Sequence, residues 1–175
     1  AEVLKKQFGD RVRFAILGRF DKGNLSCIPE EEFQEYVKAG IVDFYGYQEM
    51  RRYYQAGDVF CLPSYREGLP MSIIEAMASG LPIVTTDAVG CRETVEDGFN
   101  GFTVPVGNVE PLVNRLAHLI GDPELRTRMG KAGREKAIAD FSVENVVEQH
   151  KKLYESVLKS ANRERKQASA NRTDT

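Results

Sequence analysis

Two carboxylates flank a short turn in the middle of the chain. Glu67 and Glu75 stand eight positions apart in the segment SYREGLPMSIIEAMASGLP, on either side of a Gly-Leu-Pro turn. The turn leads into a helix pattern at 71–79 that is apolar nearly all round, as buried helices are, and Glu75 is its only charge. A buried carboxylate is costly unless something pairs with it or hydrogen-bonds to it. Hydroxyls of a bound ligand would meet that need.

The turn itself predicts a phosphate site. It places free backbone N–H groups at the positive end of the helix, which is a ready binding site for phosphate. Pro70 has no N–H, so we expect Leu69 and Met71 to donate, while Gly68 allows close backbone approach. A plain strand-to-helix turn would use the same residues. Phosphate next to hydroxyl-seeking carboxylates indicates a sugar nucleotide.

The rest of the chain alternates short apolar runs with helical patterns, which is typical of a parallel sheet flanked by helices. We expect strands at 12–17, 41–45, 58–62, 82–85 and 101–104, the first of them buried. We expect helices at 29–39, 49–56, 71–79, 109–120, 123–139 and 143–159, and a short one near 91–95. Few apolar residues follow, so we predict a domain at 1–160 and a disordered tail at 161–175.

The residues of interest follow the predicted strands. The ligands of open α/β sheets bind beyond the carboxyl ends of the strands. The loops after Leu17, Tyr45, Leu62 and Thr85 should therefore meet at one edge of the sheet. This agreement indicates a single site.

The segment PSYREGLP, with GCRE and DGFNG behind it, resembles the glutamate–seven residues–glutamate signature of retaining glycosyltransferases of the GT-B fold, family 4 type. The resemblance runs through residues 10–158 and is closest to bacterial enzymes that build capsule, O-antigen or lipid-linked oligosaccharides. It implies a Rossmann-like doubly wound parallel sheet, the C-terminal, nucleotide-sugar-binding half of a GT-B fold. The implied reaction is retaining transfer of a hexose or N-acetylhexosamine, UDP-linked by our expectation, to a glycan or polyprenyl-linked acceptor.

The resemblance also assigns roles to the two carboxylates. Glu67 would accept hydrogen bonds from the hydroxyls of the donor sugar near the reacting carbon, positioning and stabilising it without acting as a covalent nucleophile. Glu75 would hold the ribose hydroxyls. From the residues alone, Glu67 is equally a solvated carboxylate paired with Arg66. A buried ion pair with a neighbouring Arg or Lys is the less favoured alternative for Glu75.

Two further positions match the family's donor site. Tyr47 stands where the nucleobase is expected, although an aromatic residue at the start of a loop is more often a packing residue. Gly90 would let the chain approach the sugar. The neighbouring Arg92 and Glu93 are equally well explained by a local salt bridge.

One part of the family pattern is not matched. The family clamps the diphosphate with an Arg and a Lys that follow its first strand, whereas the strand at 12–17 corresponds to the second. We therefore expect the first strand, its two cations and the acceptor-binding domain to be missing, and this fragment to be inactive alone. Arg19 and Lys22 could replace the clamp, although exposed turn charges are the simpler interpretation.

Composition narrows the class of protein. The chain is 42% hydrophobic and 29% charged with a net charge of -2, which is ordinary for a globular protein and gives no reason to expect nucleic acid. The three cysteines are an odd number without metal-type spacing, which fits a reducing cytosol. No apolar run approaches the roughly 20 residues that span a bilayer. We expect a cytoplasmic protein, or one at the inner face of the membrane when full-length.

No pattern of metal ligands is present in the sequence. There is no Asp-x-Asp pair, and His118 and His150 have the sequence context of surface residues. Cys61 and Cys91 are interpreted as inert core residues. We expect no metal and no cofactor, the nucleotide sugar being the substrate.

Three alternatives stay open at this point. The chain could be a degenerate or non-catalytic nucleotide-sugar-binding domain, or a sugar-nucleotide epimerase of the same fold. A receiver or flavodoxin-type module is the alternative from another class. Pro63, Ser64 and Tyr65 count against a receiver, since a phosphate-accepting Asp should follow the third strand.

Overall fold

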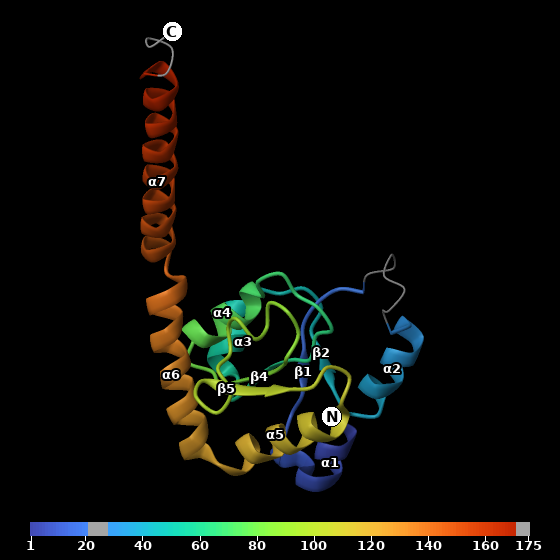
Figure 1. Cartoon of the computed structure of the whole chain (residues 1–175). Helices are drawn as coiled ribbons and strands as arrows, with labels where there is room; N and C mark the ends of the chain where they lie inside the picture. Colours follow the sequence, from blue (N-terminus) through green and yellow to red (C-terminus); the bar gives the residue numbers. More distant parts are fainter. Residues whose placement is uncertain (21–27, 171–175) are drawn as a thin grey trace. The chain divides into compact units, whose positions relative to one another are not determined.

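The computed structural model describes residues 1–20 and 28–170 (Figure 1). The chain divides into two compact units, Ala1–Arg134 and Glu135–Thr175. All the site residues predicted above belong to the first unit. Within the described residues, none of the helices combines the length and the apolar character that crossing a bilayer requires.

The first unit contains two parallel sheets. In one, β1 (Ala15–Ile16) pairs with β2 (Asp43–Phe44). In the other, β4 (Ile83–Thr86) lies between β3 (Phe60–Leu62) and β5 (Gly101–Val104). The central strand β4 is buried along its whole length, as expected for a parallel strand covered on both faces.

Helices cover both faces of the second sheet. The helices of the described residues are α1 (Glu2–Phe8), the 3-10 turn η1 (Gly9–Arg11), α2 (Glu30–Lys38), α3 (Met50–Ala56), α4 (Met71–Ala78), α5 (Val109–Gly121), α6 (Pro123–Phe141) and α7 (Val143–Ala170). The bounds of α2 to α6 follow the predicted ones closely, whereas α1 was not predicted and α7 extends eleven residues beyond its predicted end. Figure 1 shows α4 and α5 on opposite faces of the sheet that contains β4 and β5. The predicted α/β class, with a Rossmann-like parallel sheet, is confirmed.

Side chains from strands and helices form the core on one face of β4. Val84 and Phe102 pack there with Leu119, Leu125 and Met129 from α5 and α6. On the other face, α4 buries Ile73, Ile74, Ala76 and Met77. Packing on both faces thus fixes the position and direction of β4, whose carboxyl end leads into the loop at 87–91.

The prediction of a buried strand at 12–17 is wrong. Only Ala15 and Ile16 are in a strand, and both are exposed. The physical reason is that, within the described residues, β1 pairs with β2 alone, so the apolar run lacks the second neighbour that a central strand has. The short helix expected near 91–95 is a series of turns.

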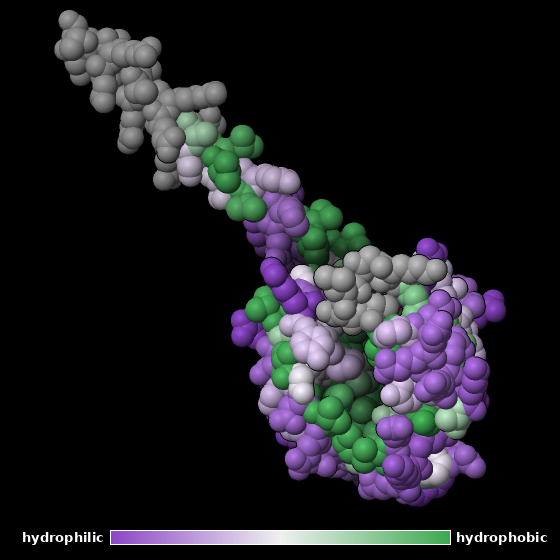
Figure 2. Space-filling view, turned by 90° about the vertical axis from the view of Figure 1, so that its right-hand side faces the viewer, coloured by the Kyte–Doolittle hydropathy of each residue, from purple (hydrophilic) through white to green (hydrophobic). Residues whose placement is uncertain are grey.

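The second unit is dominated by α7. Its apolar residues include Val143, Val147, Leu153, Tyr154, Val157 and Leu158, all of them exposed. Figure 2 shows green, apolar atoms among purple, polar ones along the described part of this helix. The helix continues to Ala170, past the predicted domain end at residue 160, and the disordered tail at 161–175 stays a prediction.

Candidate functional site

Glu67 lies in the loop that follows β3 and is held there by two hydrogen bonds. The Ser64 Oγ donates to Glu67 Oε1 at 2.5 Å, and the Glu67 backbone N–H donates to the Val89 carbonyl at 3.2 Å. Arg66 is exposed and, among the described residues, forms no ion pair with Glu67. The carboxylate is therefore oriented by a hydroxyl of its own loop and by the backbone of the loop after β4.

Gly90 packs directly against this loop. Its φ is +89°, and a Cβ placed on it would lie 2.2 Å from the Gly68 carbonyl oxygen and 2.7 Å from that of Glu67. Only glycine fits such a position, because both the backbone angle and the space exclude a side chain. The Gly90 N–H donates to Glu93 Oε2 at 2.9 Å, and Glu93 pairs with Arg92 at 3.5 Å, so the expected local salt bridge is confirmed.

The turn before α4 offers the backbone groups expected of it. Pro70 is the buried N-cap, and its carbonyl accepts from Ile73 at 3.0 Å. Within the described part of the chain, the N–H groups of Leu69 and Met71 have no hydrogen-bond partner, and both residues are exposed. These two donors at the positive end of a helix are suited to an anion.

Glu75 is exposed, so the prediction of a carboxylate buried on an all-round apolar helix is wrong. Its face of α4 also carries Met71 and Ala78, at the three- and four-residue spacings of one helical face, and both are exposed. Met and Ala are compatible with either environment, which is why the pattern looked apolar all round. Desolvation therefore does not drive Glu75 to seek a partner.

The partner that Glu75 does have is Tyr54, a residue that the sequence analysis missed. The Tyr54 hydroxyl donates to Glu75 Oε2 at 3.1 Å. Tyr54 is only 5% exposed, and its ring packs edge-on against Phe60, with 5.7 Å between centroids. Burial first, and then the charge of Glu75 and the hydrogen bond to it, raise the pKa of Tyr54 above its ordinary value.

Glu75 and Tyr54 open into a groove of about 650 Å³ between α3 and α4. Tyr47 and Arg134 line the same groove, so the structure brings together Tyr47 and Glu75, two of the predicted site residues. Glu67, Gly68 and Gly90 lie instead where the loop before α4 meets the loop after β4. Arg134 donates to the Ala78 carbonyl at 2.7 Å, at the carboxyl end of α4.

Tyr47 is not a packing residue. It is 72% exposed, and the guanidinium of Arg19 lies 4.3 Å from the centroid of its ring. The Gly18 N–H donates to the Gly46 carbonyl at 2.9 Å, which joins the loops after β1 and β2. Arg19 is thus an exposed cation stacked on the predicted base-binding residue, while Lys22 lies outside the described residues.

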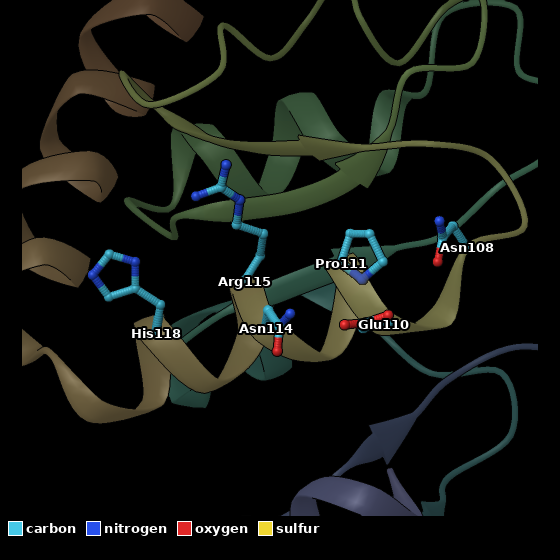
Figure 3. A pocket seen from close by; sticks show the side chains of 6 residues that line it. All are labelled: Asn108, Glu110, Pro111, Asn114, Arg115 and His118. Carbon is cyan, nitrogen blue, oxygen red and sulfur yellow. The ribbon is translucent and has the colours of Figure 1, made fainter.

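The histidines and cysteines of the described residues do not belong to the predicted site. A second hollow, of about 400 Å³, runs along α5 past Arg115 and His118 (Figure 3), but no predicted site residue lines it. His118 and His150 are both exposed. Cys91 is buried, and burial raises the pKa of Cys61 to about 12, so neither is a reactive thiol. Across the described residues, no three His, Cys, Asp or Glu side chains come together where they could hold a metal ion.

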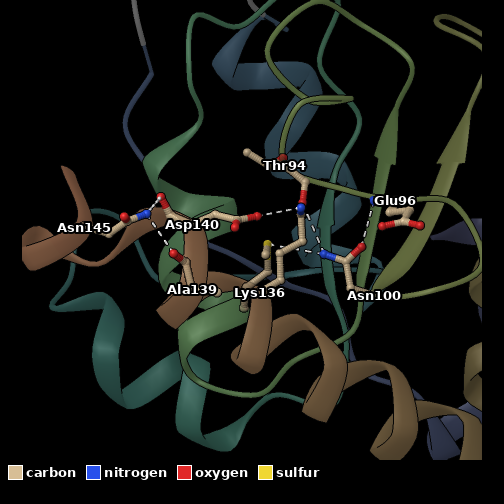
Figure 4. Close-up of polar contacts among 8 residues, drawn as sticks. Thr94, Glu96, Asn100, Lys136, Ala139, Asp140 and Asn145 are labelled. Atoms are coloured by element: carbon tan, nitrogen blue, oxygen red, sulfur yellow. Dashed lines mark hydrogen bonds and ion pairs between the residues drawn. The ribbon is translucent and has the colours of Figure 1, made fainter. Parts of the chain in front are cut away.

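Asn100 of the DGFNG block contacts α4 through Met77. It is fully buried, and its Nδ2 donates to the Thr94 carbonyl at 3.2 Å and contacts Met77 Sδ at 3.6 Å (Figure 4). Its Oδ1 accepts the Glu96 N–H at 2.8 Å. The block is therefore a structural brace that joins the turns after β4 to the helix that carries Glu75.

Comparisons with known proteins agree with this geometry. A family model described as "Glycosyl transferases group 1" matches residues 1–136. The chain is 30% identical over 152 residues to the N,N'-diacetylbacillosaminyl-diphospho-undecaprenol alpha-1,3-N-acetylgalactosaminyltransferase of Campylobacter jejuni, covering 86% of the chain and 39% of that protein. It is 34% identical over 100 residues to the UDP-Gal:alpha-D-GlcNAc-diphosphoundecaprenol alpha-1,3-galactosyltransferase of Escherichia coli, covering 57% of the chain and 26% of that protein.

A solved structure shows the same architecture. The C-terminal domain of a glycosyl transferase group 1 family protein from Francisella tularensis superposes with a TM-score of 0.71 at 25% identity. The match covers 81% of this chain and 75% of that one. The predicted correspondence with a C-terminal GT-B half is thereby confirmed, and the chain spans well under half the length of the two transferases above.

Proposed function

Because this chain belongs to the group 1 glycosyl transferases, we propose that it is the sugar-donor-binding part of a hexosyltransferase that uses a UDP-linked hexose or N-acetylhexosamine. The groove between α3 and α4 carries this proposal. It joins Tyr47 to Glu75, and Glu75 stands one helical turn from the free N–H groups before α4. Nucleobase, ribose and diphosphate lie in the same order along a nucleotide sugar.

In this arrangement each part of the sugar donor meets a group suited to it. The nucleobase stacks near Tyr47, and the ribose hydroxyls donate to Glu75 Oε1, since Oε2 already accepts from Tyr54. Met71 and Glu75 are four residues apart, about 6 Å along the helix, which suits the step from ribose to diphosphate. The diphosphate accepts from Leu69 and Met71.

The reaction would take place beside Glu67. Departure of the diphosphate places negative charge on its oxygens, and preorganised N–H donors stabilise that charge. The acceptor hydroxyl forms the new bond to the anomeric carbon on the face from which the diphosphate leaves, and a departing phosphate oxygen takes the hydroxyl proton. The configuration is then retained. Glu67, oriented by Ser64, holds the sugar hydroxyls and stabilises the positive charge that develops on the sugar ring.

The names of the two relatives support the choice of substrates. One name includes UDP-Gal as donor, and both include a diphospho-undecaprenol acceptor. We extend this to a UDP-linked donor and to a glycan or polyprenyl-linked acceptor that binds through the part of the protein beyond this chain. In that setting the protein works in the cytoplasm or at the inner face of the membrane, without a metal ion or cofactor.

Binding to this chain tests the proposal. We would titrate UDP, UDP-glucose, UDP-galactose and their N-acetyl forms by NMR without metal, beside Glu75→Ala. Saturable shifts in the loops after β2, β3 and β4, weakened by the substitution and unchanged by EDTA, are expected. Absence of shifts with every nucleotide would refute sugar-donor binding by this chain, and loss of binding in EDTA would refute metal independence.

A further inference from the structure

Tyr54 combines a buried ring with a hydroxyl aimed at a carboxylate in the groove. We propose that Tyr54 is a positioning residue that fixes Glu75 in the orientation in which it accepts the ribose hydroxyls. This inference rests on the proposed function, and specifically on the ribose role of Glu75. Tyr54 itself touches no ligand group in this proposal and acts only through the carboxylate.

The ring of Tyr54 provides a rigid support for its hydroxyl. Tyr54 is 5% exposed in α3, and its contact with Phe60 ties it to β3 at a centroid distance of 5.7 Å. Glu75 comes from the next helix, α4, which packs against α3. The hydroxyl is therefore fixed by the core, whereas the carboxylate is on an exposed face of its helix.

The exposed carboxylate is the partner that needs ordering. Within the described residues, no other hydrogen-bond or ion-pair partner reaches the Glu75 carboxylate, so one oxygen is held and Oε1 stays open to the groove. A free glutamate side chain loses rotamer freedom when it binds a ligand, and a side chain ordered beforehand has already lost it. A tyrosine is protonated at neutral pH, and the raised pKa of Tyr54 extends this to higher pH, so the hydroxyl stays a donor.

A different role for the same contact would be a simple link between α3 and α4. That role predicts lower stability without Tyr54, and an equal loss of affinity for every nucleotide. The positioning role predicts a loss of affinity only for nucleotides that carry the ribose hydroxyls. Tyr54→Phe separates the two, because it keeps the ring packing and removes only the hydroxyl.

Tyr53→Phe is the matched control. Tyr53 is the preceding residue of α3, and its ring contacts that of Tyr45 at 5.3 Å, away from Glu75. We would measure the affinities of UDP and 2′,3′-dideoxy-UDP by NMR titration for the wild type, both variants and Glu75→Gln. The spectra also report whether each variant keeps the fold.

The expected result is a selective loss. Tyr54→Phe should weaken UDP binding about two- to tenfold, the value of one preordered side chain, and leave dideoxy-UDP unchanged. Tyr53→Phe should change neither affinity. If the wild type does not prefer UDP over dideoxy-UDP, the ribose role of Glu75 and the positioning role of Tyr54 are both refuted, whereas sugar-donor binding is refuted only if no nucleotide binds. If the wild type shows that preference and Tyr54→Phe retains it in full, only the positioning role is refuted.

Discussion

Replacing Gly90 by alanine should disturb Glu67 through its backbone, while the Glu67 side chain itself is left unaltered. The added Cβ would stand 2.2 Å from the Gly68 carbonyl oxygen, where an ordinary contact needs more than 3 Å, so the two loops must separate by about 1 Å. The φ of +89° adds strain for any residue with a Cβ. Positive φ costs about 1–2 kcal/mol and the overpacking about 1–3 kcal/mol, so we expect a loss of about 2–5 kcal/mol in the free energy of unfolding.

Gly98→Ala provides the control. Gly98 also has a positive φ, +79°, but no atom lies within 4 Å of a Cβ placed there. Its substitution should therefore cost only the backbone term, about 1–2 kcal/mol. The comparison isolates the contact between the loop at Gly90 and the loop at Glu67.

The two glycine variants are compared by urea unfolding and by titration with UDP and UDP-glucose. A 1 Å displacement is enough to spoil the geometry of a binding group. Gly90→Ala should therefore lose the extra affinity for UDP-glucose over UDP, whereas Gly98→Ala should keep it. Equal stabilities of the two variants would refute the tight packing of the loops. A preserved preference for UDP-glucose in Gly90→Ala would show that this packing does not position Glu67.

Three further outcomes follow from named contacts. Asn100→Ala should lower the free energy of unfolding by about 1–3 kcal/mol in urea titrations, because the carbonyl of the buried Thr94 loses its donor; an unchanged midpoint would contradict the brace. Ser64→Ala should reduce the preference for UDP-glucose over UDP by about two- to tenfold in calorimetry, with UDP itself unaffected, since it frees only Glu67. The pKa of Tyr54 is raised on folding, so the contribution of its proton to the free energy of unfolding is complete below pH 10 and is lost as the pH rises further. Above pH 10 the wild type should therefore lose more stability than Tyr54→Phe. Parallel curves of the free energy of unfolding against pH would contradict this.

Local patterns were sufficient to predict most elements of the fold. The strand at Gly101–Val104 and the helices α4, α5 and α6 lie within two residues of their predicted bounds, because glycine, proline and apolar periodicity mark them locally. The exposure of β1 could not be predicted, since it depends on which strands pair with it. Pairing is set by contacts between residues far apart in the sequence.

The candidate site shows the same limit. The GLP turn and Glu67 could be found because the motif is contiguous. Tyr54 could not, because an aromatic residue in a short helix is typical of packing, and its contact with Glu75 spans 21 positions. The close approach of Gly90 to Gly68 likewise joins two separate loops, and the exposure of Glu75 was hidden by neighbours compatible with either environment.

Glu67 and Glu75 both accept a hydrogen bond from a hydroxyl. One hydroxyl is close in the sequence, and the other belongs to a different helix. Ser64 is three positions from Glu67, so the hydroxyl that binds that carboxylate comes from the same loop. Tyr54 belongs to α3, so the orientation of Glu75 depends on how two helices pack. Substitutions in α3 can therefore alter recognition at the ribose end while the sugar end keeps its geometry. A family that changes sugar donors could vary the two ends separately, because the hydroxyls that bind Glu67 and Glu75 come from different elements.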